Sequence, residues 1–156
     1  MIPFPDKKYS VIYADPPWSY AAGGKARNVK RHYDTMTPED IFALPVQDIA
    51  ADDCLLFMWA TFPNLDVALN AIRAWGFTYK TVAFVWVKRN RKAPGYFWGP
   101  GNWTRSNAEI CLLAVKGKPK RASASVHSII DAPVGRHSEK PAETRDRIAR
   151  LAGGVL

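Results

Sequence analysis

The sequence contains little cysteine and histidine, and it has no long apolar run. Its two cysteines, Cys54 and Cys111, each lie inside an apolar stretch, which predicts reduced core thiols and neither a disulfide nor a metal site. The three histidines have no ligand-like spacing, so we expect no metal. No stretch is long enough to span a bilayer, and the N-terminus lacks a secretory signal pattern. We therefore expect a cytoplasmic protein.

Acidic residues are also scarce relative to basic ones. The 156 residues include 22 Lys and Arg against 14 Asp and Glu, a formal net charge of +8. This excess favours a polyanionic partner such as nucleic acid, and a solvated basic surface is the alternative. Six tryptophans strengthen the first interpretation, because aromatic faces between cations suit unpaired bases. The length predicts one domain with a single substantial core.

An apolar run at residues 9–14 is followed at once by Asp15-Pro-Pro-Trp18. The run predicts a strand buried on both faces of a parallel sheet. Two consecutive prolines cannot donate hydrogen bonds to a neighbouring strand, so the strand should end in a rigid elbow. Because open α/β sheets bind ligands at the carboxyl ends of their strands, we expect a site here.

The atoms of this elbow suit an amino group. The Asp15 carboxylate accepts hydrogen bonds, and the Pro16 carbonyl is directed by the Pro17 ring that follows it. Two acceptors can take both hydrogens of an exocyclic base amine and favour a pyramidal nitrogen with its lone pair aimed outward. Trp18 adds a face on which a base can stack, worth about 1–3 kcal/mol. The elbow therefore predicts methylation of a base amine. The alternative is a strand-ending turn with a buried tryptophan.

The rest of the chain alternates strand-like and helix-like segments. We expect further strands at 54–60, 78–88, 109–116 and 126–134, and helices at 37–44, 64–75 and from 141 to 152. Thr37 and Asn64 are expected to cap the first two helices, and Gly76 to end the second. Trp75 is expected in the core. This order predicts an α/β fold with a mainly parallel sheet.

Two long polar segments carry cations. Residues 19–35 read as a basic loop leaving the elbow, for which substrate contact and a solvated linker are both open; its cations are Lys25, Arg27, Lys30 and Arg31. Residues 89–105 combine aromatics with cations, which favours nucleic-acid binding over a plain linker. The cations that we expect to contact phosphates there are Arg89, Arg91 and Lys92.

An ordered series of motifs covers nearly the whole chain. They are Ala14-Asp-Pro-Pro-Trp18, His32-Tyr-Asp-Thr-Met-Thr37, Leu56-Phe-Met-Trp-Ala-Thr61, Trp75-Gly-Phe77, Phe84-Val-Trp-Val-Lys88, Gly101-Asn-Trp-Thr-Arg105, Asn107-Ala-Glu-Ile-Cys111, Lys116-Gly117 and Arg136-His-Ser-Glu-Lys-Pro141. In these the sequence resembles the MT-A70 family of adenine methyltransferases. That family includes phage and bacterial DNA adenine methylases and the eukaryotic messenger-RNA adenine methylase.

The resemblance implies a Rossmann-like, three-layer methyltransferase domain that uses S-adenosylmethionine and has a circularly permuted motif order. Residues 15–18 would hold the target amine beside the donor methyl group. Asp15 would also face the ammonium of the cofactor, and Ser138 and Lys140 would bind its methionine part. The substrate-binding residues implied by the resemblance are Tyr20, Tyr33, Trp103, Arg105, Asn107 and Glu109.

The sequence departs from the family at its end. After a helix like that expected at 140–152, the family continues with another strand and a Trp-Gly-Asn type segment. This sequence stops at Leu156, where that strand should begin. We therefore expect the 1–156 domain to be incomplete at its C-terminus, as a shortened form, part of a longer protein, or a natural short form.

Several functions remain open from the sequence. The first is an enzyme that methylates the adenine 6-amino group, in DNA more than in RNA. The second is a non-catalytic, nucleic-acid-binding subunit in a homo- or heterodimer. Methylation of the cytosine amine is a third, because the same acceptors could serve it.

Overall fold

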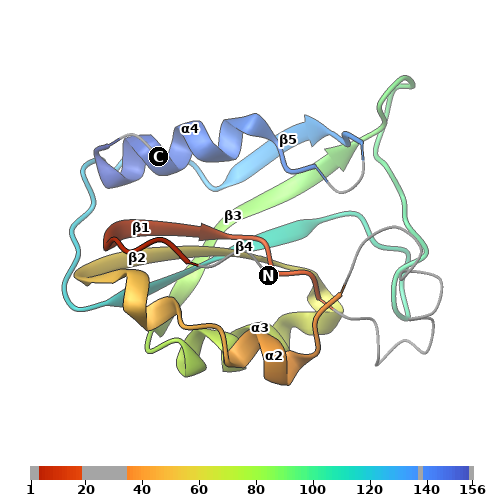
Figure 1. Cartoon of the computed structure of the whole chain (residues 1–156). Coiled ribbons are helices and arrows are strands. Elements are labelled where there is room, and N and C mark those ends of the chain that lie inside the picture. The colour runs from red at the N-terminus through yellow and green to blue at the C-terminus, as the bar shows by residue number, and fades with distance from the viewer. Residues whose placement is uncertain (1–3, 19–34, 137–138, 155–156) are drawn as a thin grey trace.

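The computed structural model describes residues 4–18, 35–136 and 139–154. Five strands form one sheet in the order β1-β2-β4-β3-β5 (Figure 1). They are β1 (Tyr9–Ala14), β2 (Ala50–Ala60), β3 (Thr78–Arg89), β4 (Glu109–Lys116) and β5 (Ile129–Pro133). The helices are α2 (Pro38–Phe42), α3 (Leu65–Ala74) and α4 (Ala142–Ala152), and the 3-10 turns are η2 (Val46–Ile49) and η3 (Phe62–Asn64).

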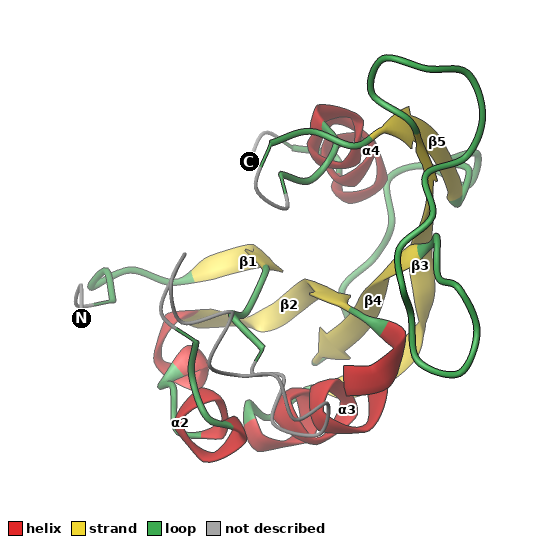
Figure 2. Cartoon of the chain, turned by 90° about the vertical axis from the view of Figure 1, so that its right-hand side faces the viewer, coloured by secondary structure: helices red, strands yellow, loops and turns green. Residues whose placement is uncertain are grey.

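Helices cover both faces of this sheet. Figures 1 and 2 show α4 over one face and α2 with α3 against the other, so the molecule has three layers. The core is divided accordingly. Ile41 of α2 and Ile72 of α3 pack with one set of strand side chains. Ile148 of α4 packs with the set on the opposite face, which includes Phe57 and Trp59 of β2.

The sheet is mixed, and the predicted mainly parallel arrangement is not confirmed. β1 pairs with β2 and β3 pairs with β5 in parallel, whereas β4 runs antiparallel to both of its neighbours. The reason lies between β3 and β4, where residues 90–108 contain no helix. A chain that returns to the sheet without a crossover helix pairs antiparallel, as in a long hairpin.

The first strand lies at an edge of the sheet. Both of its faces pack against the core, with Ile12 on one side and Val11 on the other, but most of its residues are only partly buried. The strand completely buried from Cys54 to Ala60 is β2, which has β1 and β4 as neighbours. The strand predicted at residues 9–14 is present and contacts the core on both faces, but its predicted burial is wrong in degree, because an edge strand has a neighbour on one side only and all of its residues stay partly buried or exposed.

Predicted core residues are found in the core. Trp75 is 2% exposed, and its indole N–H donates to the Ile41 carbonyl at 2.9 Å. Cys54 and Cys111 are free and buried. Burial raises the pKa of Cys54 to about 11 and raises that of Cys111 further, so both thiols stay protonated at neutral pH.

The predicted helix ends are partly confirmed. Thr37 Oγ1 accepts from the backbone N–H of Asp40 at 3.1 Å and so caps α2. Gly76 follows α3 with φ 83°. Asn64 occupies the predicted N-cap position of α3, but its side chain donates to Thr61 Oγ1 and makes no capping hydrogen bond to the helix. Within the described residues, the helices are too short or too polar to cross a membrane.

Candidate active site

Four charged side chains from different parts of the chain meet at one edge of the sheet. Asp15 follows β1, Lys88 is the penultimate residue of β3, and Lys140 precedes α4. Glu109 opens β4, and its register partner is Trp86 near the end of β3. Because β4 runs against its neighbours, its first residue lies where β1, β2 and β3 end. The edge predicted from Asp15 alone therefore gathers residues that are up to 125 positions apart in sequence, counted from Asp15 to Lys140.

These four side chains form a connected network of ion pairs. Lys88 Nζ lies 3.1 Å from Glu109 Oε1, and Lys140 Nζ lies 2.9 Å from Glu109 Oε2. Lys140 Nζ also lies 3.5 Å from Asp15 Oδ2. The Glu109 and Lys140 side chains are 10% and 12% exposed, whereas Asp15 is 48% exposed. Lys88 is 20% exposed, so Asp15 is the most accessible of the four side chains to solvent or a ligand.

Two tryptophans lie beneath the lysines. The Lys140 ammonium is 5.6 Å from the ring centroid of Trp59, and the Lys88 ammonium is 4.9 Å from that of Trp86. The two rings meet edge to face, with centroids 6.2 Å apart. Indole faces attract cations, so the two tryptophan rings help to hold the ammonium groups of Lys88 and Lys140 on either side of Glu109.

The same arrangement shifts the acid–base properties of Asp15 and Lys140. Partial burial raises the pKa of Asp15, and the like charge of Glu109 adds to this, while Lys140 opposes it. For Lys140, burial lowers the pKa, but the attraction of Glu109 and Asp15 outweighs it, so the pKa is raised. Lys140 thus remains a cation at neutral pH, and Asp15 binds a proton more readily than an exposed aspartate does.

Backbone and indole hydrogen bonds hold the elbow that follows β1. The Pro16 carbonyl accepts from the backbone N–H of Trp18 at 2.9 Å, which uses one of its two lone pairs and fixes its direction. The Pro17 carbonyl accepts from the backbone N–H of Met36 at 3.1 Å. The Trp18 indole N–H donates to the carbonyl of Trp59 at 3.1 Å. The elbow is therefore tied to the end of β2 as well as to β1.

Trp18 itself is 9% exposed and packs in the core beside Ile41 and Met58. Its position gives it a structural role in holding the elbow. Stacking on a base through its small exposed part stays a prediction.

Trp59 connects the elbow to Lys140. Its indole N–H donates to the Tyr13 hydroxyl at 2.6 Å, its carbonyl accepts from Trp18, and its ring lies under Lys140. The residue is fully buried. Sequence reasoning assigned no role to Trp59, Tyr13 or Lys88. The available signal was their position, because each lies within two residues of the end of an expected strand.

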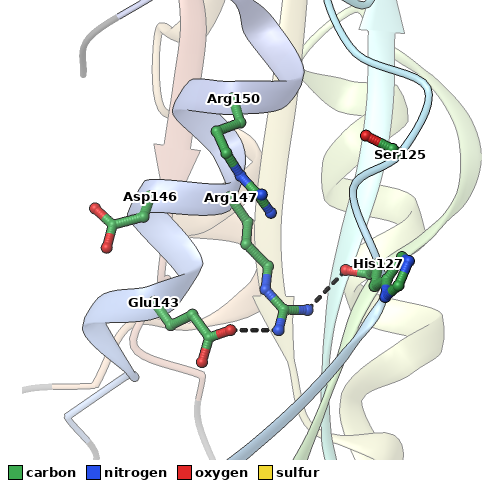
Figure 3. A pocket seen from close by; sticks show the side chains of 6 residues that line it. All are labelled: Ser125, His127, Glu143, Asp146, Arg147 and Arg150. Carbon is green, nitrogen blue, oxygen red and sulfur yellow. Dashed lines mark hydrogen bonds and ion pairs between the residues drawn. The ribbon is translucent and has the colours of Figure 1, made fainter.

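Helix α4 is fixed relative to β5 by Arg147, and this fixes the segment that carries Lys140. Arg147 donates to the carbonyls of His127 and Ile129, both at 2.7 Å, and pairs with Glu143 on its own helix (Figure 3). Glu143 and Arg147 are four positions apart on the helix, a spacing that brings their side chains together. The hollow shown in Figure 3 lies around this anchor and not at Asp15.

The segment between β3 and β4 is held by Asn107. Its amide N–H groups donate to the carbonyls of Lys88 and Phe97 at 2.8 and 2.6 Å, and its oxygen accepts from the Lys88 N–H at 3.0 Å. Arg105 donates to the Gly99 carbonyl at 3.0 Å. Both predicted substrate-binding side chains are thus engaged with the backbone of their own segment.

The predicted phosphate-binding cations of this segment differ in their surroundings. Arg89 makes two hydrogen bonds to the Asp131 carboxylate, at 2.6 and 2.8 Å, and its guanidinium lies 4.3 Å from the Tyr96 ring centroid. This pairing raises the pKa of Arg89 and lowers that of Asp131. Arg91 and Lys92 are exposed to solvent.

Some predicted site residues lie outside the described residues. They are Tyr20, Lys25, Arg27, Lys30, Arg31, Tyr33 and Ser138.

Comparison with known proteins gives consistent similarities. The sequence pattern of the MT-A70 family matches residues 9–154. A type II methyltransferase, M.MunI, from a Mycoplasma species is 37% identical over 169 residues, covering 94% of this chain and 69% of the relative. The human N(6)-adenosine-methyltransferase catalytic subunit METTL3 and a Drosophila melanogaster MT-A70-like protein are each 30% identical over 150 residues. This chain spans only 24% and 23% of those two proteins, and 95% of this chain is matched in each.

Proposed function

This chain belongs to the MT-A70 family of adenine N6-methyltransferases, and from this premise we propose that it transfers a methyl group from S-adenosylmethionine to the 6-amino group of adenine in nucleic acid. The observation that carries the proposal is the placement of Asp15. Its carboxylate is half-exposed on a hydrogen-bonded elbow, and it lies 3.5 Å from Lys140, whose side chain is only 12% exposed. We further propose that residues 1–156 form a single methyltransferase domain.

The elbow would hold the amine of the target base. The Asp15 carboxylate and the remaining lone pair of the Pro16 carbonyl would accept one hydrogen each from the amino group. Both acceptors are fixed before the base arrives, so little reorganisation is needed at the moment of reaction. The nitrogen lone pair then points away from the two acceptors. Pro17 and Trp18 would act by fixing this geometry.

The charged cluster suits the amino-acid part of the cofactor. A half-exposed carboxylate can face an ammonium, and a lysine whose pKa is raised stays protonated to face a carboxylate. Asp15 and Lys140 would therefore hold the two ends of an α-amino acid, with Ser138 as a further proposed contact. When bound, S-adenosylmethionine supplies a methyl group on a positively charged sulfur.

The chemistry also needs a destination for one proton. A carbon–nitrogen bond forms as the carbon–sulfur bond breaks, and the nitrogen must then lose a proton. Asp15 accepts from that nitrogen, and its raised pKa makes it a better proton acceptor than an exposed aspartate. Neither cysteine is suited to act as a nucleophile, because both are buried and their pKa values are raised.

We propose DNA as the substrate and RNA as the second candidate. The relative named a type II methyltransferase is more identical to this chain (37% against 30%) and is covered over more of its own length (69% against 24%) than the human adenosine methyltransferase, which favours DNA. The net charge of +8 supports a nucleic-acid partner of either kind. The proposed contacts to the nucleic acid are Tyr20, Lys25, Arg27, Lys30, Arg31, Tyr33, Arg91, Lys92 and Arg105.

The test compares wild type with Asp15→Asn, which keeps the size of the side chain and removes its charge. We expect methyl incorporation into adenine-containing DNA to fall by at least about 100-fold, because the amide oxygen of Asn is an uncharged, weaker acceptor that cannot take the proton from the reacting nitrogen. Affinity for the nucleic acid should be nearly unchanged. Full activity of Asp15→Asn alone would show that the Asp15 carboxylate is not needed for the reaction. Wild-type-like activity only in a complex with a partner subunit would favour a non-catalytic binding subunit.

A further inference from the structure

Trp103 lies in the turn formed by residues 99–106, and its side chain is fully exposed, at 102%. Its backbone φ is 72°, in the left-handed region that bulky residues seldom occupy. A conformation of this kind costs free energy and persists only where the surrounding structure enforces it. The turn therefore holds a large aromatic side chain in solvent at an energetic cost.

The surrounding hydrogen bonds show how the turn is enforced. The backbone N–H of Gly99 donates to the Ser106 carbonyl at 2.8 Å, and Arg105 donates to the Gly99 carbonyl at 3.0 Å. Gly101 has φ 69°, and a Cβ at this position would collide with the Thr104 carbonyl oxygen. These hydrogen bonds close the two ends of the turn, and position 101 has room only for glycine.

The segment that contains this turn, residues 90–108, carries both exposed aromatic and exposed cationic side chains. Tyr96 and Trp98 are 47% and 53% exposed, and their rings meet edge to face with centroids 6.1 Å apart. Arg91 and Lys92 are exposed on the same segment. Aromatic faces among cations suit bases and phosphates, whereas a protein-binding surface is typically depleted of lysine at its centre.

The turn also lies at the functional edge of the sheet. It connects the end of β3 to the start of β4, and so leaves the sheet at the edge where Asp15 and Glu109 lie (Figure 1). We propose that Trp103 is a stacking platform for an unpaired nucleobase in the strand that carries the target adenine. This inference rests on the nucleic-acid partner of the proposed function, and it names the form of the substrate: a strand whose bases are exposed next to the target.

The experiment separates stacking on bases from attraction to phosphates. The affinity of the full chain is measured for a labelled oligodeoxyadenylate and for an abasic strand of the same length and charge. We expect Trp103→Leu to weaken binding of the oligodeoxyadenylate roughly 5- to 150-fold, the range of one lost base–aromatic stack. Binding of the abasic strand should not change. Trp103→Phe, which keeps an aromatic face, should retain most of the affinity.

Three results would overturn the inference. They are equal losses on both strands, no loss on either strand, and an oligomer of the wild type that Trp103→Leu dissociates while oligodeoxyadenylate binding is kept. The last result would assign the turn to protein association. Tyr79→Leu serves as the control, because Tyr79 is an aromatic residue that is 39% exposed near the start of β3, away from this edge, and the variant should bind both strands as the wild type does. If the wild type binds neither strand, the proposed nucleic-acid partner is wrong as well, whereas binding without dependence on Trp103 refutes this inference alone.

Discussion

At the scale of single residues, Asp15 carries a charge that the fold disfavours. Its pKa is raised by burial and by Glu109 above the ordinary value of 3.8. Between that value and its pKa in the folded state, the folded protein binds more protons than the unfolded chain. The free energy of unfolding therefore falls as pH rises through this range. The carboxylate is kept at some loss of stability, as is common for reactive groups.

Removing this charge should stabilise the protein. We expect Asp15→Asn to unfold at a higher temperature than the wild type at pH 7, and the difference to shrink as pH is lowered towards 4. Thermal unfolding followed by circular dichroism across this pH range measures the effect. A variant that is less stable than the wild type at pH 7 would show that the attraction of Lys140 outweighs the burial of Asp15.

Tyr13 helps to hold Trp59, the residue that contacts both the elbow and Lys140. Its hydroxyl accepts from the indole of the fully buried Trp59 at 2.6 Å, and burial raises its pKa, so the hydroxyl remains protonated at neutral pH. Tyr13→Phe leaves that buried indole N–H without its acceptor. We expect a loss of about 1–3 kcal/mol in the free energy of unfolding, measured by urea denaturation.

Tyr79→Phe is the matched control for Tyr13, because Tyr79 is 39% exposed in β3. Its substitution should change stability little. Equal effects of the two changes would mean that the Trp59–Tyr13 hydrogen bond does not hold the site.

The sequence motifs predict the charged residues of the site but not the buried aromatic residues that hold them in place. Asp15, Glu109 and Lys140 were named from motifs, and the structure brings them together. Trp59 was missed because a tryptophan inside an apolar strand reads as core. Its hydrogen bonds to two segments distant in sequence depend on how strands lie side by side, which an apolar run does not specify.

At the scale of elements, every expected strand and helix is present, and their ends agree within a few residues. The direction of β4 was not foreseen, although the signal was available. No helical pattern lies between residues 89 and 109, and a parallel return would need a crossover. Asn64 is at the N-cap of α3 as expected, and its side-chain capping hydrogen bond is absent for a local reason. The 3-10 turn η3 precedes α3, and the Asn64 side chain bonds to Thr61 at the start of that turn.

The segment between β3 and β4 should depend on Asn107. Its amide makes three hydrogen bonds to the backbone of Lys88 and Phe97. Asn107→Ala should lower the free energy of unfolding by about 1–3 kcal/mol and speed protease cleavage within residues 90–106. Limited proteolysis with mass spectrometry locates the cleavage sites.

Asn102→Ala is the control, since Asn102 is exposed on the same segment. It should leave the cleavage rate at the wild-type level. If Asn107→Ala is cleaved no faster than this control, the segment is held by other contacts.

At the scale of the whole molecule, exposed cations lie towards two opposite edges of the sheet. Arg91 and Lys92 lie on the segment after β3, while Lys118 and Lys120 follow the end of β4 and therefore lie towards the opposite edge. Arg89 is engaged by Asp131, so it is a weaker candidate for phosphate contact than its two neighbours.

Neutralising Arg91 and Lys92 together should weaken nucleic-acid binding and reduce its salt dependence. If both contact phosphates, the slope of log affinity against log salt should become shallower by about 1.4–1.8. Lys118→Gln with Lys120→Gln removes the same charge at the other edge and should leave the slope near that of the wild type. Equal changes in the two double variants would mean that the whole basic surface, and not the edge with Asp15, attracts the strand.

The most direct test of the account is the identity of the methylated nucleoside. The chain is incubated with isotopically labelled S-adenosylmethionine and with DNA or RNA, and the digested nucleosides are analysed by mass spectrometry. We expect the label on the 6-amino group of adenine with the wild type and at least about 100-fold less of it with Asp15→Asn. Label on cytosine, or equal labelling of adenine by both proteins, would contradict the role given to the Asp15 carboxylate.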